Sequence, residues 1–307
     1  MNDGDAAIAA LFEAGSPRGL ARAISRAESG RGADLTQAFA PRTGRAMTIG
    51  LTGPPGVGKS TLCAALVAVV RRTGKTVGVV SVDPSSPFSH GAILGDRIRL
   101  TEHFTDPGVF IRSMASRGHL GGLAGATGDA VAFMDAFGLE VVAIETVGVG
   151  QSEIEIAELA DTTLVALQPG SGDSVQLLKA GILEVADIFV VNKADHPMAL
   201  QLQREIRSML EMLDLSGRVP ELIATRARED AGIEELWQSI LRHQAYLRES
   251  GGLERKRRGA FAHRVRALVM GELARRVDER IEDSTRADDG PRDPYSTAAH
   301  IYETIVS

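Results

Sequence analysis

The chain alternates between short apolar runs and longer amphipathic stretches over most of its length. Helix-length segments such as 61–72 and 198–213 lie between most of these runs. Near-continuous apolar strands separated by helices are typical of a parallel sheet that is covered on both faces. The runs of strand length are residues 47–51, 76–82, 109–113, 140–144, 163–167, 188–191 and 221–224.

The two ends of the chain have a helical pattern instead. Residues 5–30 show apolar positions at helical spacing, broken near Gly15-Ser16-Pro17, and residues 253–283 form one long charge-rich pattern with an apolar stripe from Phe261 to Ile281. A polar stretch and a last short amphipathic helix at 295–305 follow. The expected domains are therefore an N-terminal helical extension (1–45), a central α/β domain (46–250) and a C-terminal helical arm (251–307).

Composition narrows the class of protein. Of 307 residues, 44% are apolar and 24% charged, as in ordinary globular proteins. The acidic N-terminus lacks a secretory signal pattern, and the single cysteine, Cys63, suits a reducing cytoplasm, so we expect a cytoplasmic protein. No apolar run reaches the ~18 residues of a membrane span. The net charge of −6 argues against a general nucleic-acid binder.

A phosphate-binding motif follows the first apolar run. The pattern G-x-x-x-x-G-K-[ST] is matched by Gly53-Pro54-Pro55-Gly56-Val57-Gly58-Lys59-Ser60-Thr61, with a strand before it and a helix after it. Glycines let successive N–H groups point at phosphate oxygens, and the positive end of the helix adds to the attraction. We expect Lys59 to reach the β- and γ-phosphates and Ser60 to ligate Mg²⁺. The motif predicts a nucleoside triphosphate site.

A later strand end predicts which base is bound. Val191 is followed by Asn192-Lys193-Ala194-Asp195, and N-K-x-D at this position is the guanine-selecting motif of GTPases. The Asp195 carboxylate can accept from both the ring N–H and the exocyclic amine of guanine, Asn192 can bridge base and loop, and the Lys193 stem can lie over the ring. Lysine occurs at only five positions and asparagine at two. We therefore expect GTP rather than ATP, although Asp195 also suits a helix N-cap.

Three acidic residues stand where a magnesium ligand is expected. Asp83 follows the run 79–82, Asp96 lies in a loop, and Glu145 follows 141–144. Glu145 has the position of a Walker B carboxylate, which holds Mg²⁺ or its water. Asp83 is equally compatible with a turn before Pro84, and Asp96 by itself is more simply a surface acid.

Other segments allow more than one interpretation. Glycine-rich residues 117–122 are more often a turn or a helix start. Residues 170–174, with Lys179 downstream, follow the carboxyl end of an apolar run, where parallel sheets bind their ligands. A loop with a solvated lysine explains these residues as well as a ligand site does. The basic run 255–258 is expected to be a solvated end of the long helix.

Together these motifs resemble those of the MeaB/ArgK family of P-loop GTPases. The similarity runs from about residue 41 to residue 245. It implies a P-loop α/β fold with a mostly parallel central sheet flanked by helices, an N-terminal helical extension and a C-terminal helical dimerisation arm. Members of the family are GTPase chaperones of adenosylcobalamin-dependent acyl-CoA mutases, chiefly methylmalonyl-CoA mutase. The residues that carry the resemblance are 53–61, 82–86, 95–97, 117–122, 145–151 and 192–195.

The resemblance also implies roles for single residues. It places Ser60, Asp83, Asp96 and Glu145 around Mg²⁺. It places Asp173 and Lys179 in a third switch that meets the mutase and helps hydrolysis. These two residues join Lys59 and Glu145 as the candidate catalytic group, and Glu145 and Gln151 are candidates for orienting the attacking water.

The family's base-contacting loop falls at Arg226-Ala227-Arg228. Arginine replaces the usual serine at 226, which puts that side-chain contact in doubt, while the Ala227 N–H is expected to stay available to the base.

The expected function is therefore GTP hydrolysis to GDP and phosphate by a homodimeric chaperone that gates cofactor loading and protects a mutase. Hydrolysis is expected to be slow alone and faster with the partner. A metal-insertion GTPase and a GTP-dependent kinase are the alternatives. The seven histidines are scattered without ligand spacing, and no acceptor pocket for a kinase is recognisable.

Overall fold

Seven parallel strands form one sheet in the computed structural model, which describes residues 1–84, 103–116, 124–146, 152–171, 184–212, 218–286 and 293–306. The order across the sheet is β3-β2-β4-β1-β5-β6-β7. After β1 the chain forms β2, β3 and β4 on one side of that strand, and then β5, β6 and β7 on its other side. In such sheets ligands bind beyond the carboxyl ends of the strands at this switch point. The strands are β1 (Met47–Thr52), β2 (Val77–Pro84), β3 (Val109–Ser116), β4 (Val141–Thr146), β5 (Thr162–Leu167), β6 (Ile188–Val191) and β7 (Glu221–Ala224).

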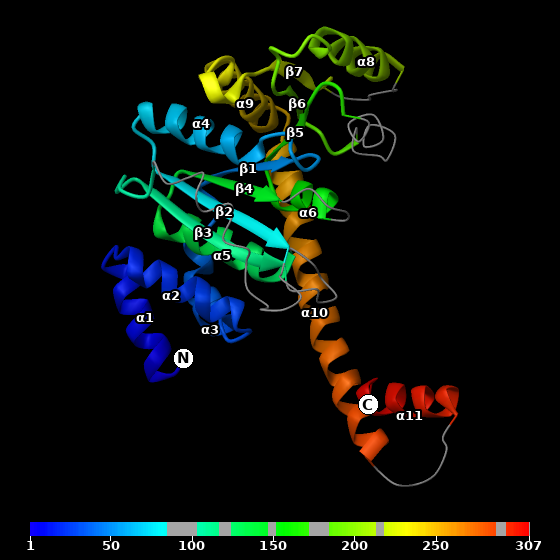
Figure 1. Cartoon of the computed structure of the whole chain (residues 1–307). Coiled ribbons are helices and arrows are strands. Elements are labelled where there is room, and N and C mark those ends of the chain that lie inside the picture. The colour runs from blue at the N-terminus through cyan, green and yellow to red at the C-terminus, as the bar shows by residue number, and fades with distance from the viewer. Residues whose placement is uncertain are drawn as a thin grey trace. The chain divides into compact units, whose positions relative to one another are not determined.

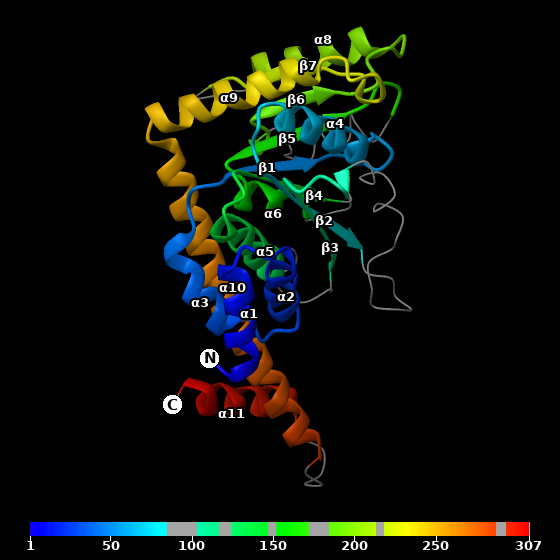
Figure 2. The same cartoon turned by 90° about the vertical axis from the view of Figure 1, so that its left-hand side faces the viewer.

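Helices cover both faces of the sheet because successive strand residues point to opposite sides. One face packs on α4 (Lys59–Arg72) and α9 (Ile233–Glu249), and α9 runs across the outer strands in Figure 2. The other face packs on α5 (Ala124–Phe137), α6 (Ser152–Leu159) and α8 (Ala199–Met212). This arrangement confirms the predicted α/β fold with a parallel, doubly covered sheet.

The N-terminal helices extend the core on the side of α5 (Figure 1). They are α1 (Asp3–Glu13), α2 (Pro17–Glu28) and α3 (Ala33–Phe39), and Pro17 stands at the first position of α2, where its missing N–H costs nothing. The Phe12 ring stacks on Phe39 at a centroid distance of 4.2 Å, and both rings contact Phe133 of α5 edge-on. Aromatic burial therefore joins these helices to the central domain, and residues Met1–Ala260 form one compact unit.

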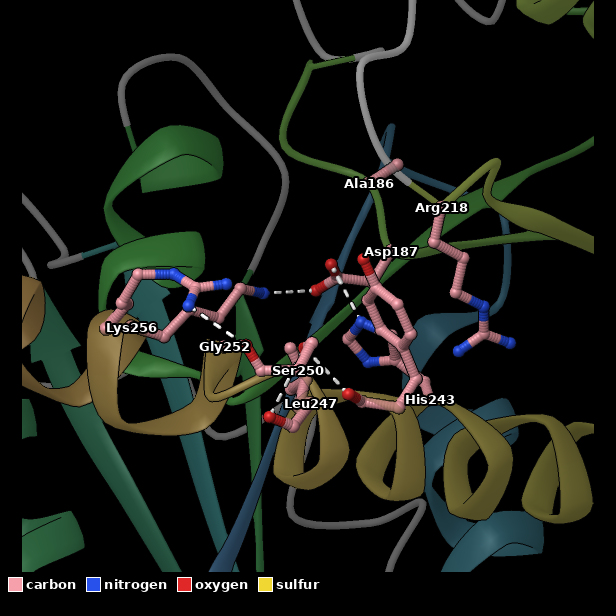
Figure 3. A pocket seen from close by; sticks show the side chains of 10 residues that line it. Ala186, Asp187, Arg218, His243, Leu247, Ser250, Gly252 and Lys256 are labelled. Carbon is pink, nitrogen blue, oxygen red and sulfur yellow. Dashed lines mark hydrogen bonds and ion pairs between the residues drawn. The ribbon is translucent and has the colours of Figure 1, made fainter.

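Helix α10 (Gly252–Arg286) begins in this unit, and its second turn is held by ion pairs. Arg257 donates to both carboxylate oxygens of Asp161, at 3.0 and 2.9 Å, and Lys256 Nζ donates to Asp187 Oδ2 at 2.6 Å. The expectation that the basic run 255–258 is simply solvated is therefore wrong for these two residues, because the buried Asp161 and the partly buried Asp187, which precede β5 and β6, need partners (Figure 3 shows those of Asp187).

The second compact unit, Phe261–Ser307, contains the rest of α10 and helix α11 (Pro294–Val306). Both helices were expected from the pattern, although α10 continues a few residues beyond the predicted end at 283. No helix in the described part of the chain is both long and apolar enough to span a membrane.

Candidate nucleotide site

The loop between β1 and α4 has the backbone that a phosphate-binding loop needs. Gly53, Gly56 and Gly58 have φ angles of +138°, +79° and +93°, which side chains other than glycine rarely adopt. A Cβ at Gly53 would lie 2.1 Å from the carbonyl oxygen of Ala166, and one at Gly58 would lie 2.8 Å from Asn192 Nδ2. The motif glycines are therefore required both by the turn and by close neighbours.

Lys59 lies inside the curve of this loop. Its side chain is buried, and Nζ donates to the carbonyl oxygens of Gly53 at 2.7 Å and Pro54 at 3.0 Å. Because Lys59 is also the first residue of α4, the ammonium and the helix N-terminus present positive charge at the same place. The loop is thus arranged to receive phosphate oxygens.

A buried carboxylate stands next to the loop. Glu145, near the end of β4, is 4% exposed, and it accepts from the Ser60 hydroxyl at 2.6 Å and from the Ser81 hydroxyl at 3.5 Å. Hydroxyl and carboxylate oxygens are the hard ligands that Mg²⁺ prefers, so this donor set fits the ion. Asp83 is the penultimate residue of β2 at the same edge of the sheet.

Cys63, one turn further along α4, is a free thiol packed in the core. Burial, with a smaller contribution from the Glu145 charge, raises the pKa of its thiol well above the usual value, so the side chain stays a protonated, buried thiol at neutral pH. Within the described residues, no cluster of three or more histidine, cysteine, aspartate or glutamate side chains is placed to hold a metal ion.

Asn192 joins the phosphate loop to the predicted base site. It directly follows β6, and its Nδ2 donates to the Val57 carbonyl at 2.8 Å. Its Oδ1 accepts from the Thr225 hydroxyl at 3.1 Å and from the Ala227 N–H at 3.2 Å. One buried side chain therefore holds three segments that are far apart in the sequence.

Lys193 makes a second link of the same kind. It has a left-handed φ of +56°, and its Nζ donates to the Gly56 carbonyl at 2.8 Å and to Gln168 Oε1 at 2.5 Å. Asp195 follows with an exposed side chain. Gln168 stands immediately after β5 and was not predicted as a site residue. Its position after a strand at the ligand edge was the only signal for it.

The loop after β7 differs from the expectation in one respect. The Ala227 N–H was expected to be available to the base, but it donates to Asn192 Oδ1. The cause is the short connection from Thr225, which brings the loop onto the buried asparagine. Arg226 and Arg228 are exposed, and Arg226 pairs with Glu229 at 2.9 Å.

Several predicted site residues lie outside the described part of the chain. These are Asp96, Gln151, Asp173 and Lys179, with the glycine-rich segment 117–122. Among the described ones, the structure brings Lys59, Ser60 and Glu145 together at the phosphate loop. It also brings Asn192 and Lys193 onto that loop, so one ligand can reach both motifs.

Comparison with known proteins agrees with this geometry. A family model described as methylmalonyl-CoA mutase-associated GTPase MeaB matches residues 20–282. A putative GTPase of Pyrococcus abyssi is 44% identical over 305 residues, which cover 95% of this chain and 94% of that protein.

Two further matches extend the comparison. A Mus musculus protein named methylmalonic aciduria type A homolog, mitochondrial, is 38% identical over 214 residues, covering 68% of this chain and 52% of that protein. The crystal structure of a LAO/AO transport system kinase has a TM-score of 0.71 and 25% identity, covering 100% of this chain and 99% of that one. The family match over most of the chain and the high identity with a GTPase show that this protein belongs to the MeaB family of P-loop GTPases.

Proposed function

We propose that this GTPase is a chaperone of an adenosylcobalamin-dependent acyl-CoA mutase, either methylmalonyl-CoA mutase or a close relative. The family description names association with that mutase, and the mouse relative is named after methylmalonic aciduria. The structural observation that supports guanine nucleotide binding is the Asn192 side chain, which bonds the phosphate loop and the base motif together. In this role the protein gates cofactor loading and protects the mutase.

The chemistry is attack by water on the γ-phosphorus, which yields GDP and phosphate. Lys59 and the backbone N–H groups of residues 56–60 meet the negative charge that develops on the transferring group. Ser60 and Glu145, with Asp83 and Asp96, would hold Mg²⁺, which neutralises phosphate charge when bound. We assign Asp173 and Lys179 to a third switch that meets the mutase and helps hydrolysis, so hydrolysis is slow without the partner.

The nucleotide assignment is tested by calorimetric titration with GTP, GDP and ATP in the presence of magnesium. The native chain is expected to bind GTP and GDP and to show no measurable heat with ATP. Lys59→Ala is expected to abolish tight binding, and Asp195→Asn to weaken GTP and relax base choice by about 10²-fold or more, because the donors of guanine lose their acceptor.

Asp230→Asn, the same chemical change at an exposed acid of the neighbouring loop, is the matched control for Asp195→Asn and is expected to bind normally. Strict guanine preference in the Asp195 variant would contradict the base-site assignment.

The partner assignment is tested by measuring phosphate release from GTP with and without purified methylmalonyl-CoA mutase. Acceleration by the mutase, together with co-elution of the two proteins, is the expected result. No acceleration and no complex with this mutase or with other acyl-CoA mutases would exclude the chaperone role. Transfer of label from γ-labelled GTP to an acceptor rather than to water would favour a kinase.

A further inference from the structure

Ser81 interrupts an apolar row on β2. Alternate residues of a strand face the same side of a sheet, and toward α4 this strand presents Val77, Val79 and then Ser81. The serine is as deeply buried as the valines, with 3% of its surface exposed. Burying a hydroxyl at an apolar position of the core is unfavourable unless the hydroxyl finds a partner. The side chain of Ser81 is therefore expected to have a task that an apolar side chain could not perform.

The partner of Ser81 is the carboxylate of Glu145. The two residues are register partners on the neighbouring parallel strands β2 and β4, so both side chains project toward α4. The Ser81 hydroxyl donates to Glu145 Oε2 at 3.5 Å, and within the described part of the chain it bonds no other group. Both residues are buried, and a hydrogen bond is electrostatically stronger in the interior of a protein than in water.

A second hydroxyl holds the other oxygen of the same carboxylate. Ser60, in the first turn of α4, donates to Glu145 Oε1 at 2.6 Å. Glu145 therefore lies between one donor from a helix and one donor from a strand. Its register partner on the other side, Leu51 of β1, is apolar and cannot donate to it. The two hydroxyls together determine how the plane of the carboxylate is turned.

The two hydroxyls differ in what else they do. Ser60 belongs to the phosphate-loop motif and is itself a proposed ligand of Mg²⁺, whereas Ser81 belongs to no motif and bonds the carboxylate alone. The Ser81 contact is longer than the usual length of about 2.8 Å for a hydroxyl donor. Hydrogen bonds around reacting groups commonly shorten when the substrate complex forms. Ser81 is thus placed to act on Glu145 without itself contacting the nucleotide.

We propose that Ser81 is a positioning residue for the magnesium-binding carboxylate. Its hydroxyl holds Glu145 Oε2, which keeps Oε1 directed at Ser60 and the ion. This inference rests on the proposed role of Glu145 in magnesium binding. Groups that orient a metal ligand typically change metal affinity by about 10- to 100-fold, and the length of the Ser81 contact places its expected effect at about three- to tenfold.

The test measures how Mg²⁺ slows the release of fluorescent GDP from the full-length chain. Release is followed by stopped flow at a series of free Mg²⁺ concentrations and in EDTA, and the concentration that gives half of the slowing reports the affinity for the ion. Ser81→Ala is expected to raise this concentration by about three- to tenfold. It is expected to change release in EDTA less than about twofold, because the nucleotide contacts remain. Ser81→Thr keeps the hydroxyl and is expected to restore the native concentration within about twofold.

Ser113→Ala is the matched control. Ser113 is the register partner of Ser81 on β3, so it lies in the same row of the sheet but one strand further from Glu145. This variant is expected to keep the native dependence on Mg²⁺. The proposal is overturned if Ser81→Ala keeps the native dependence, if Ser113→Ala has the same effect as Ser81→Ala, or if Ser81→Thr is no better than Ser81→Ala.

Glu145→Gln separates this inference from the assignment of the magnesium site. It is expected to raise the half-effective Mg²⁺ concentration at least about tenfold, because the ion loses a charged ligand. If this variant responds to Mg²⁺ as the native chain does, the magnesium assignment fails and the role of Ser81 fails with it. If Glu145→Gln weakens the response and Ser81→Ala does not, only the role of Ser81 is overturned.

Discussion

At the scale of single residues, Asn192 decides how the nucleotide site is assembled. Its buried amide donates to Val57 and accepts from Thr225 and Ala227, so each half of the amide has a separate task. Replacement by aspartate, which has nearly the same shape, removes only one of these tasks. Its carboxylate can still accept hydrogen bonds but can no longer donate one.

We expect Asn192→Asp to reduce GDP affinity by about 10- to 100-fold and to lower the free energy of unfolding by about 2 kcal/mol, since the Val57 carbonyl is then buried against a charge. Displacement of fluorescent GDP and urea unfolding measure the two effects. Asn2→Asp is the control, because it makes the same chemical change at the only other asparagine. Asn2 caps α1, and aspartate caps a helix equally well, so we expect GDP affinity and the free energy of unfolding to stay unchanged. Native affinity in the Asn192 variant would contradict the linking role.

Gln168 is the second residue whose importance depends on a contact between distant segments. It accepts from Lys193 Nζ, which also bonds Gly56, so it fixes the lysine beside the phosphate loop. We expect Gln168→Ala to speed GDP release by about tenfold, and Gln168→Glu to restore slow release because the acceptor oxygen returns. Stopped-flow release of labelled GDP measures both. Equal release rates in the two variants would show that the side chain only fills space.

At the scale of elements, the start of α10 is attached to the sheet by ion pairs rather than by apolar packing. Asp161 is 4% exposed and Arg257 33% exposed, and the guanidinium also donates to the Ala46 carbonyl at 2.9 Å. Arg257→Ala leaves the buried acid without its cation. We expect a loss of about 2 kcal/mol in the free energy of unfolding, reduced from the cost in a fully buried pair by the partial exposure of the arginine.

Arg258→Ala is the control for this change, since the exposed neighbour in the same helix is expected to change the unfolding free energy by less than about 0.5 kcal/mol. Urea denaturation of both variants measures the difference. Equal stability of the two would show that the ion pair does not hold the helix.

Asp187 makes the attachment of α9 and α10 depend on pH. Burial favours the neutral acid, but the hydrogen bond from His243 and the charge of Lys256 outweigh burial and lower the pKa of the carboxyl below its usual 3.8. A folded-state pKa below the unfolded value gives stability that is complete above the unfolded pKa and is lost as the pH falls through the folded one.

Asp187→Asn is therefore expected to be less stable than the native chain by about 1–2 kcal/mol at neutral pH, with the difference shrinking as the pH falls below the usual aspartate pKa and the carboxyl becomes protonated. Urea unfolding at a series of pH values tests this. A difference that stays constant from neutral pH down to the acid end of the series would show that the charge of Asp187 is not what stabilises these helices.

The elements were largely predictable from the sequence, whereas their contacts were not. The seven apolar runs coincide with the seven strands because burial on both faces leaves a continuous apolar signal. Strand β2 extends beyond its predicted end at Val82, since ladder pairing of Asp83 with Ala115 does not require an apolar side chain. The phosphate and base motifs are contiguous and could be recognised. The partners of Arg257 and Lys256 lie 96 and 69 residues away, and nothing local indicates them.

At the scale of the whole molecule, the second unit carries exposed apolar side chains that a monomer has no reason to keep. Phe261, Leu268 and Val269 of α10 are 70%, 57% and 53% exposed. Solvent-exposed apolar residues gathered along one helix mark an interaction surface. We propose that this stretch of α10 is the seam of a homodimer.

In a symmetric dimer each substitution acts twice, so removing one apolar side chain from the seam costs about 3–6 kcal/mol of association free energy. Leu268→Ser is therefore expected to weaken the dimer by about 10²- to 10⁴-fold and to shift the chain to the monomer mass at micromolar concentration. Arg280→Ser shortens an exposed polar side chain of the same helix and is expected to leave the dimer intact. Light scattering during size-exclusion chromatography measures the mass of each variant, and GDP binding shows that the first unit is folded. A native chain that is monomeric at these concentrations would refute the seam, because its apolar surface would then be exposed without a partner copy.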